Sequence, residues 1–336
     1  MQAVPDAPVV TAPHRVLVTG PSGFVGKVLV QRLLADDATQ VVAAARYATA
    51  SGNPRVTCFA VGDIGPTTDW AAALERADVV VHLAARVHVM HDRSTDPLAE
   101  FRNANVAATL ELARQAARAG VRRFIYISSI KVNGEFTLAG RPFRADDRPA
   151  PTGPYAVSKH EAESGLRQLT TDTQMQVVVV RPPLVYGPGV SANFRNMMDW
   201  LQRGRPLPLG AVDNLRSLVG VDNLCDLITA CTRHPDAAGQ TFLASDDEDI
   251  STPDLLRRLG SALGRPARLL PLPAVLLRAG LTALGQRSVG LRLCSSLQVD
   301  VGPTRALLGW KPPLTLDQGL RRTAHAYQRH IAHRAR

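Results

Sequence analysis

The chain has 336 residues, 45% of them hydrophobic, which is enough to bury the core of an ordinary protein with one or two domains. Its net charge is +10, but the 39 basic residues, all arginine except four lysines, are spread along the chain without interleaved aromatic residues, which disfavours a nucleic-acid-binding protein. No run approaches the roughly 18 apolar residues that cross a bilayer.

Residues 1–13 lack the basic start and apolar core of a secretory signal, so we expect a disordered tail on a cytoplasmic protein. The cysteines form no CxxC pair, and the histidines of one central segment lack carboxylate or cysteine partners at metal-ligand spacing. We therefore predict reduced thiols and no metal site. The residues concerned are Cys58, Cys225, Cys231, Cys294, His82, His88 and His91.

The first motif in chain order is TGPSGFVG, at Thr19 to Gly26. It follows an apolar run at 15–18 and precedes an amphipathic helical pattern at 27–34, so it is predicted to be a strand-to-helix turn. Such a turn brings backbone close to a pyrophosphate, and the helix N-terminus attracts the phosphate charge. The sequence thus predicts a dinucleotide site.

Each glycine of this turn has an expected task. Gly20 allows the tight turn, Gly23 lets the backbone approach the pyrophosphate, and Gly26 lets the helix pack closely on the strand. Phe24 and Val25 lie between the last two glycines and are assigned to the same cofactor site.

Apolar runs alternate with helical patterns through the first half of the chain. This alternation predicts an α/β fold, a Rossmann-type doubly wound parallel sheet with helices on both faces, and a smaller C-terminal substrate-binding lobe. Prominent helices are expected at 98–119 and 155–169. Strands are expected at 15–18, 41–45, 56–59, 79–83, 124–128 and 177–181.

Prolines break the pattern into short segments beyond the last of these strands, where the lobe is expected to begin. Within the lobe, the apolar stretch 272–284 contains Arg278. We expect it to pack on the lobe core, with a helix on a membrane surface as the alternative. The predicted domains are 14–183 with 218–245 for the Rossmann domain, and 184–217 with 246–336 for the lobe.

Two later motifs supply groups for proton transfer, SSIKVNG at Ser128 to Gly134 and YAVSK at Tyr155 to Lys159. A Tyr and a Lys four residues apart share one face of a helix. A free tyrosine titrates near pH ~10, but a neighbouring ammonium favours the phenolate, so Tyr155 can act as acid and base beside Lys159. Ser129 ends a central strand, where its hydroxyl can hydrogen-bond the reacting oxygen.

These motifs, together with Gly62-Asp63-Ile64, the run at 79–85 and Asn105-Val106, resemble those of the extended short-chain dehydrogenase/reductases. The likeness runs from about Arg15 to about Thr323. It is strongest to bacterial nucleotide-sugar 4-epimerases and 4-ketoreductases, particularly the reductases that form UDP-N-acetylquinovosamine. The resemblance implies an NAD(P)-dependent enzyme for a UDP-sugar, and a homodimer that pairs the two long helices as a four-helix bundle.

The resemblance also implies cofactor contacts. Lys159, beside Tyr155, holds the nicotinamide ribose, and Asp63 with Ile64 contacts the adenine. Arg46 stands where an acid would bond the ribose 2′-hydroxyl of NAD, and its guanidinium can pair with a 2′-phosphate, so NADP(H) is favoured over NAD(H). The other expected cofactor-binding residues are Leu83, Ala84, Ala85, Arg86, Asn105 and Pro182.

The family register SSxxVYG selects Ser129 rather than Ser128 as the catalytic hydroxyl. Dehydratases of the superfamily carry an Asp-Glu pair directly after that residue, where this chain has Ile130 and Lys131, so dehydration is disfavoured. Asn133 replaces the usual Tyr, which leaves the shape of the nearby pocket open.

The segment 181–189, RPPLVYGPG, resembles the family's crossing into the lobe. Asn193 and Arg216 follow, and in UDP-sugar enzymes the matching residues hold the nucleotide diphosphate, which suits the fork of an arginine. Lys131 and Asn133, with Ser129, complete the expected substrate site.

Three functions compete. The first is reduction of the C4 keto group of a UDP-4-keto-6-deoxy-N-acetylhexosamine for surface polysaccharide synthesis, favoured by the resemblance and by Arg46. The alternative is a UDP-hexose 4-epimerase that keeps NAD tightly bound. The third is a redox-silent binding protein on the same fold, which the intact Tyr155, Lys159 and Ser129 disfavour.

Overall fold

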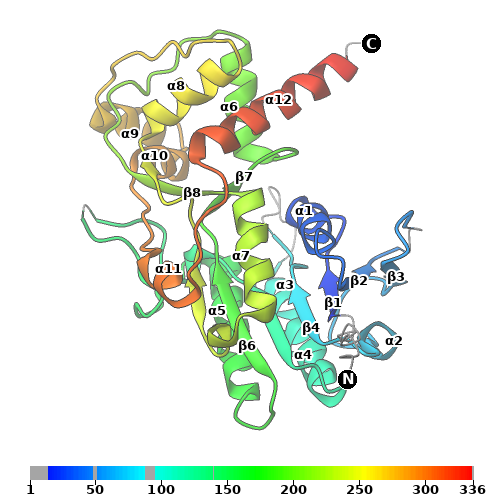
Figure 1. Cartoon of the computed structure of the whole chain (residues 1–336). Coiled ribbons are helices and arrows are strands. Elements are labelled where there is room, and N and C mark those ends of the chain that lie inside the picture. The colour runs from blue at the N-terminus through cyan, green and yellow to red at the C-terminus, as the bar shows by residue number, and fades with distance from the viewer. Residues whose placement is uncertain (1–13, 48–50, 88–94, 139, 335–336) are drawn as a thin grey trace, which may run out of the picture.

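The computed structural model describes residues 14–47, 51–87, 95–138 and 140–334. A seven-stranded parallel sheet has the order β3-β2-β1-β4-β5-β6-β9 (Figure 1). Its strands are β1 His14–Thr19, β2 Thr39–Ala45, β3 Val56–Ala60, β4 Val79–His82, β5 Arg123–Ile127, β6 Gln176–Arg181 and β9 Thr241–Leu243. The order reverses between β1 and β4, and the carboxyl ends of the strands at such a reversal are where open α/β sheets bind ligands. The predicted Rossmann-type α/β fold is confirmed.

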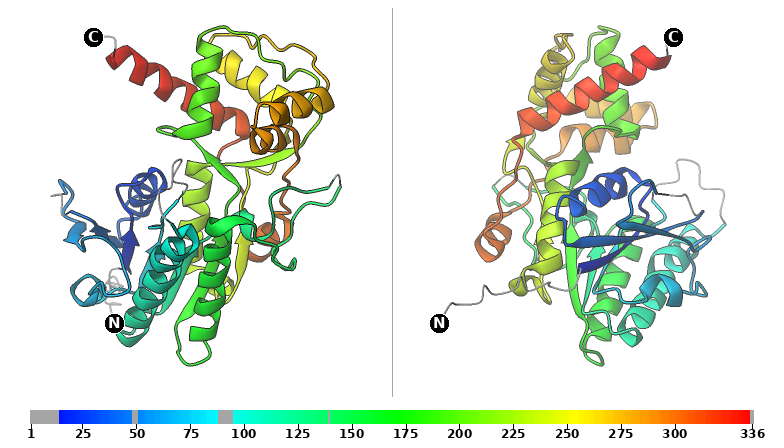
Figure 2. Two further views of the ribbon diagram at one scale, coloured as in Figure 1. Left: turned by 180° about the vertical axis from the view of Figure 1, so that it is seen from behind. Right: turned by 45° about the vertical axis from the view of Figure 1, so that its right-hand side comes forward.

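The inner strands β1, β4, β5 and β6 are rich in valine and buried on both faces, because helices cover both sides of the sheet, whereas the edge strand β3 is only partly buried (Figure 2). In β1, Val16 and Val18 pack in one apolar core, whereas Leu17 packs in the other. The first core is covered by α1 and α7, and the second by α2, α4 and α5. These helices are α1 Phe24–Leu33, α2 Ala71–Leu74, α4 Ala108–Arg118, α5 Gly153–Leu169 and α7 Val221–Arg233.

The helix expected at 98–119 is divided. Helix α3, Pro97–Arg102, begins after Asp96, whose carboxylate accepts a hydrogen bond from the Ala99 amide. A single π-helical turn, Asn103–Ala107, then leads into α4. Such a turn adds one residue to the helix, which changes the face on which the following side chains lie. Here it places Asn105 in the interior, 1% exposed.

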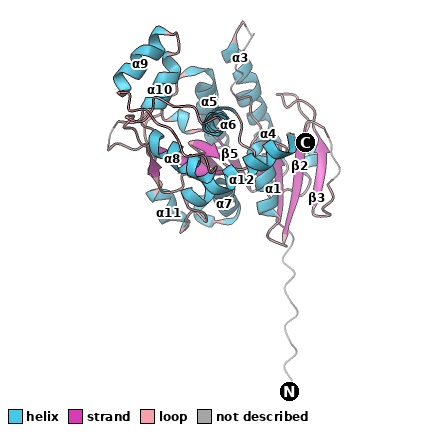
Figure 3. Ribbon diagram, turned by 90° about the horizontal axis from the view of Figure 1, so that it is seen from above, coloured by secondary structure: helices cyan, strands magenta, loops and turns pink. Residues whose placement is uncertain are grey.

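A smaller lobe lies against the carboxyl edge of the main sheet (Figure 1, Figure 3). Its three-stranded sheet has the order β10-β8-β7, with β7 Leu184–Tyr186, β8 Arg216–Gly220 and β10 Asp249–Ile250. The helices of this part of the chain are α6 Ala192–Gln202, α8 Thr252–Ala262, α9 Ala274–Ala283, α10 Arg287–Cys294, α11 Gly302–Leu308 and α12 Leu316–Arg334. Two short 3-10 helices, Ile130–Val132 and Pro235–Ala237, complete the described elements.

The expected return of 218–245 to the main sheet needs a correction. Strand β8 pairs with β7 and β10 in the smaller sheet, so the return begins with α7 at Val221 and is completed by β9. The cause is the alternation of side chains along β8: Leu218 packs in the lobe core and Val219 packs in the main core. One short strand thereby contributes to both cores.

Among the described residues, no helix combines the length and the apolar character needed to cross a bilayer. Within the same residues, no cluster of three or more His, Cys, Asp or Glu could hold a metal ion. The expected tail at 1–13 and the residues His88 and His91 lie outside the described part of the chain.

We predict that Gly26→Ala destabilises the protein by about 1–3 kcal/mol, the usual cost of overpacking. A Cβ at position 26 would lie 2.1 Å from the Gly20 carbonyl oxygen, so α1 would have to move away from β1. Thermal unfolding of the cofactor-free protein measures the effect. Gly65→Ala is the matched control, since an added Cβ there meets nothing within 4 Å, and a comparable loss in that variant would contradict the packing argument.

Candidate active site

The glycine turn joins β1 to α1 as the sequence predicts. Gly20 has a φ of +67°, and a Cβ there would lie 3.3 Å from the backbone of Ala84. Gly23 is exposed at the N-cap of α1, and no side chain of the described residues caps the amide groups of the first turn. These amides fit the pyrophosphate of a dinucleotide, because helix N-termini bind anions through such uncapped donors. Phe24 and Val25 form the first turn of α1 and pack against the core beside β1.

The segment after β4 runs beside this turn. The Thr19 hydroxyl accepts hydrogen bonds from the amides of Leu83, at 3.2 Å, and Ala84, at 3.1 Å. His82 lies behind them, bonded through its ring nitrogens to Thr19 and Thr109. Burial, and then the charge of Lys159, lower the pKa of His82 to about 3, so it is a neutral structural residue at physiological pH.

Asn105 connects this segment to helix α5, which carries Tyr155 and Lys159. Its amide nitrogen donates to the Arg86 carbonyl and to the Ser158 hydroxyl, both at 3.0 Å, and its side-chain oxygen accepts from the Arg86 amide at 2.8 Å. Both amide hydrogens of the side chain are therefore used by protein partners. Asn105 connects the segment after β4 to α5, and its expected contact with the cofactor stays a prediction.

Helix α5 carries the proposed acid and base. Tyr155, Lys159 and Glu163 follow at intervals of four and share one face of the helix. Lys159 is 2% exposed; its Nζ donates to the Ile127 carbonyl at 2.8 Å and lies 4.6 Å from the centre of the Tyr126 ring. Burial lowers the pKa of Lys159 to about 7, and the Glu163 carboxylate partly offsets this shift.

The tertiary structure distinguishes the two neighbouring serines. The Ser129 hydroxyl shares a hydrogen bond with Tyr155, whereas the Ser128 hydroxyl donates to the buried Glu163 carboxylate at 2.5 Å. Burial raises the pKa of Tyr155 to about 12, with the Ser129 hydrogen bond acting in the opposite direction. The geometry therefore brings Ser129 to Tyr155, as the sequence register predicts, and gives Ser128 a structural role.

Glu163 is a site residue that the sequence reasoning missed. It is 0% exposed and receives two hydrogen bonds from the Arg181 guanidinium, from Nε at 2.9 Å and from Nη2 at 2.6 Å. Arg181 in turn donates to the Asn133 side-chain oxygen at 2.9 Å. The signal was present as a third polar residue in the series Tyr155, Lys159, Glu163, but only the partner on β6 shows its function.

Asn133, which the sequence assigns to the substrate site, lies in a buried hydrogen-bond network, and its substrate contact stays a prediction. The side chain is 3% exposed, and its nitrogen donates to the Arg144 carbonyl at 2.7 Å while its oxygen accepts from Arg181. An asparagine fits here because it supplies both a donor and an acceptor to a buried network. Asn133 therefore supports the wall of the site from behind.

Arg46 and Asp63 form an exposed ion pair, with 2.6 Å between Arg46 Nε and Asp63 Oδ1. The sequence reasoning assigned them to different parts of the cofactor, the 2′-phosphate and the adenine. The structure places them together because β2 and β3 are neighbouring parallel strands, so that their carboxyl ends lie side by side. An acid thus lies beside Arg46, although it comes from the end of β3 and not from the end of β2.

The remaining predicted substrate residues come from three other segments. Lys131 is half-buried, with its ammonium 3.3 Å from the Glu135 carboxylate. Arg216, at the start of β8, donates through Nη1 to the carbonyls of Arg292 and Ser295. Asn193 lies in the first turn of α6, but its side chain is outside the described part of the structure.

Three further predicted cofactor residues follow the carboxyl ends of β6, β3 and β4. Pro182 is buried directly after β6, and its carbonyl accepts from the Ile130 amide at 3.0 Å. Ile64 packs against the second core, close in sequence to Asp63. Ala85 completes the half-buried segment between Leu83 and Arg86.

We predict that the free energy of unfolding of the cofactor-free protein rises with pH between about 7 and about 9. Above this window the unfolded chain also loses the thiol protons of Cys225 and Cys231, whose pKa values burial raises in the folded protein, and this opposes the rise. Folding depresses the pKa of Lys159 from its ordinary value of 10.5 to about 7, so in this window the unfolded chain binds more protons than the folded one. Urea unfolding across the window measures the rise. In the control Lys159→Met the rise should shrink by a few kcal/mol; identical slopes in the two proteins would contradict the assigned pKa.

Comparison of the sequence and the fold with known proteins identifies the family of this chain. The sequence model of the NAD dependent epimerase/dehydratase family matches residues 16–244. A UDP-glucose 4-epimerase of Vibrio cholerae is 46% identical over 316 residues, which cover 94% of this chain and 96% of that protein. A GDP-6-deoxy-D-mannose reductase of Pseudomonas aeruginosa is 29% identical, covering 92% of this chain and 95% of its own.

The solved structure of MoeE5 in complex with UDP-glucose and NAD matches this fold with a TM-score of 0.74 at 25% identity, over 94% of this chain and 99% of that one. The family match covers both the glycine turn and the Tyr155 to Lys159 motif. This chain is therefore an enzyme of the NAD dependent epimerase/dehydratase family, related in sequence and fold to enzymes of nucleotide-sugar chemistry.

Proposed function

We propose that this protein is a UDP-hexose 4-epimerase that keeps NAD(H) bound through the catalytic cycle. The observation that carries the proposal is the 46% identity to a UDP-glucose 4-epimerase over 94% of the chain, combined with a complete Ser129, Tyr155 and Lys159 constellation. The sequence alone placed a 4-ketoreductase first. The comparison favours the epimerase, which was the alternative.

The roles of the three residues follow from their positions. Burial by itself keeps Tyr155 as the neutral phenol. As the phenolate, it would take the proton of the C4 hydroxyl while the C4 hydrogen passes as hydride to the bound nicotinamide, and as the phenol it would return that proton when the hydride comes back to the other face of the sugar. Ser129 hydrogen-bonds the reacting oxygen and orients it toward Tyr155. Lys159, in its protonated form 6.0 Å from the Tyr155 ring, favours the phenolate. NAD, held at the glycine turn, supplies the hydride acceptor and donor.

The ion pair between Arg46 and Asp63 supports NAD rather than NADP. A 2′-phosphate approaching Arg46 would meet the Asp63 carboxylate 2.6 Å from the guanidinium, and two anions competing for one cation repel each other. A ribose 2′-hydroxyl, by contrast, can donate to such a carboxylate. We therefore reverse the cofactor preference drawn from Arg46 alone.

The surroundings of Ser129 support oxidoreduction without dehydration. Ile130 is 3% exposed and apolar, and Lys131 cannot act as the carboxylic acid that a dehydratase uses. We assign the uridine diphosphate to the lobe, where Arg216 and Asn193 lie at the starts of β8 and α6. A homodimer through α4 and α5, in the cytoplasm, remains our expectation from the resemblance.

A second candidate is the C4 ketoreductase. It is supported by the likeness of the segments around His82 and Ser129 to the quinovosamine-pathway reductases, and by the relationship to a reductase of a GDP-sugar. An epimerase retains its cofactor, whereas a reductase exchanges it at every turnover. The decisive experiment incubates the purified protein with UDP-glucose or UDP-N-acetylglucosamine and no added cofactor, and separately with the 4-keto sugar and stoichiometric NAD(P)H. Interconversion in the first mixture supports the epimerase; NAD(P)H consumption only in the second decides for the reductase.

We expect Tyr155→Phe to lower turnover by at least about 100-fold, the usual contribution of a general acid and base. Binding of NAD should persist, because the phenol contributes little to holding the pyrophosphate. Chromatographic assay of the sugar nucleotides gives the rate, and extraction of the copurified nucleotide gives the occupancy. Turnover like that of the unchanged protein would exclude Tyr155 as the acid and base.

Asp63→Ala should improve the binding of NADPH relative to NADH by about tenfold, since it removes one carboxylate that a 2′-phosphate must approach. Arg46 is then free to pair with that phosphate. Fluorescence titration of cofactor-free protein with both nucleotides measures the ratio. In the matched double variant Asp63→Ala/Arg46→Ala the gain should vanish; a gain that survives there would show that Arg46 does not contact the 2′-phosphate.

A further inference from the structure

The outer face of helix α9 is unusually apolar for an exposed helix. Its inner side packs in the lobe core through Leu277, with Leu281 beside it, as the sequence predicts for 272–284. On the opposite side, Val275 is 66% exposed and Leu276 is 57% exposed, and the helical period places Ala279 and Ala283 on the same face. An ordinary amphipathic helix would carry charged residues there.

The charged residues in the sequence around this helix are all positive. Residues 255–299 contain seven arginines and no aspartate or glutamate. From residue 251 to the end of the chain there are 14 basic and 3 acidic residues, whereas residues 1–250 contain 25 basic and 26 acidic ones. The net positive charge of the protein therefore resides entirely in the last part of the lobe.

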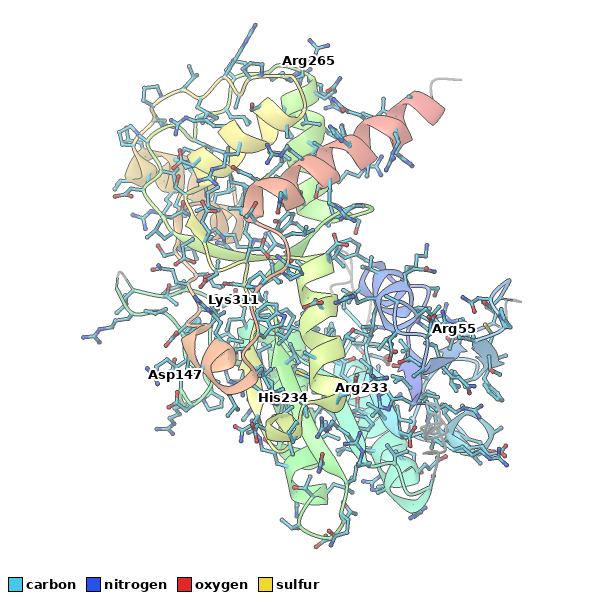
Figure 4. All side chains as sticks on the ribbon, viewed as in Figure 1. Arg55, Asp147, Arg233, His234, Arg265 and Lys311 are labelled. Atoms are coloured by element: carbon cyan, nitrogen blue, oxygen red, sulfur yellow. The ribbon has the colours of Figure 1, made fainter. Side chains whose placement is uncertain are left out.

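Several of these arginines are available to an external anion. Four are exposed, and no salt bridge engages them within the described residues: Arg265, Arg268, Arg278 and Arg292. Arg278 lies on α9 itself, while Arg265 and Arg268 lie on the linker that leads into it. Figure 4 shows Arg265 projecting from the tip of the lobe, and Figure 3 shows α9 and α10 at the periphery of the molecule.

We propose that α9 and the linker 263–273 dock on the surface of an anionic lipid bilayer. The aliphatic face around Val275 and Leu276 enters the headgroup layer, and the arginines contact lipid phosphates, the combination typical of interfacial helices. This inference goes beyond the proposed catalytic function and does not depend on it. The sequence analysis gave core packing as the expectation for this helix and a membrane surface as the alternative. In this proposal, core packing explains the inner side of α9 and the membrane surface explains its outer side.

Other occupants fit these observations less well. A second copy of the chain, related by a two-fold axis, would bring the same arginines face to face without any acid to neutralise them. A nucleic acid would use the arginines but would leave the aliphatic face of α9 exposed to water. An anionic bilayer can bind the arginines through its phosphates and bury the aliphatic face of α9 in its headgroup layer.

The test is flotation of the purified full-length protein with vesicles made of equal parts phosphatidylcholine and phosphatidylglycerol, and with phosphatidylcholine vesicles. We expect at least about tenfold tighter binding to the anionic vesicles, weakened by salt. Val275→Ser/Leu276→Ser should lower this binding by at least about tenfold, since the aliphatic contact is lost. Tyr47→Ser is the matched control, because Tyr47 is 75% exposed beyond β2 and should not touch the bilayer.

A second variant tests the charge separately. Arg278→Gln should weaken binding to the anionic vesicles by about fivefold and leave thermal unfolding unchanged. Absence of binding by the unchanged protein, equal binding to both kinds of vesicle, or full binding by Val275→Ser/Leu276→Ser would each overturn the proposal. A change of oligomeric state in that double variant, without a change in lipid binding, would assign the face to a second copy instead.

Discussion

The carboxylate of Glu163 is the constraint around which the catalytic half of this molecule is arranged. It is fully buried, and its charge is offset by the equally buried Arg181 guanidinium and by the Ser128 hydroxyl. A buried ion pair of this kind contributes little net stability, but removal of one partner leaves an uncompensated charge at a cost of about 3–5 kcal/mol. The pair therefore specifies how α5 sits against the ends of β5 and β6.

The position of α5 in turn sets the chemistry. Lys159 lies one turn before Glu163 and Tyr155 one turn before Lys159, so a shift of the helix would move the whole series relative to Ser129. Burial lowers the pKa of Lys159 and raises that of Tyr155, so both shifts disfavour the charged forms of these two side chains. Asn105 adds the connection from this helix to the segment under the cofactor. Few of these groups are exposed, which suits a reaction that must keep water away from transferred hydride.

The end of β6 connects the candidate site to the lobe. Arg181 ends β6, and the chain continues through two prolines into β7, where the buried Tyr186 hydroxyl donates to the Asp246 carboxylate at 2.6 Å. Asp246 also accepts hydrogen bonds from the Gly220 amide and the Asn223 side chain, at the start of α7. The chain thus passes into the lobe beside a hydrogen-bonded cluster centred on Asp246, which joins β7, the end of β8 and α7. Arg216, the expected diphosphate-binding residue, lies at the start of β8.

The sequence by itself determined the α/β class, the glycine turn and the Tyr155 to Lys159 series, because each depends on local spacing along one strand or one helix. It also selected Ser129 over Ser128 by register. Only the tertiary structure decided what depends on contacts between distant elements: that β8 belongs to the smaller sheet, that Asn133 and Asn105 hydrogen-bond to groups within the protein, and that Glu163 meets Arg181. Arg46 shows the reason most directly. Arg46 alone indicates NADP(H), but the parallel pairing of β2 with β3 brings Asp63 beside it, and together the two residues led us to propose NAD(H). No pattern within either strand contains that pairing.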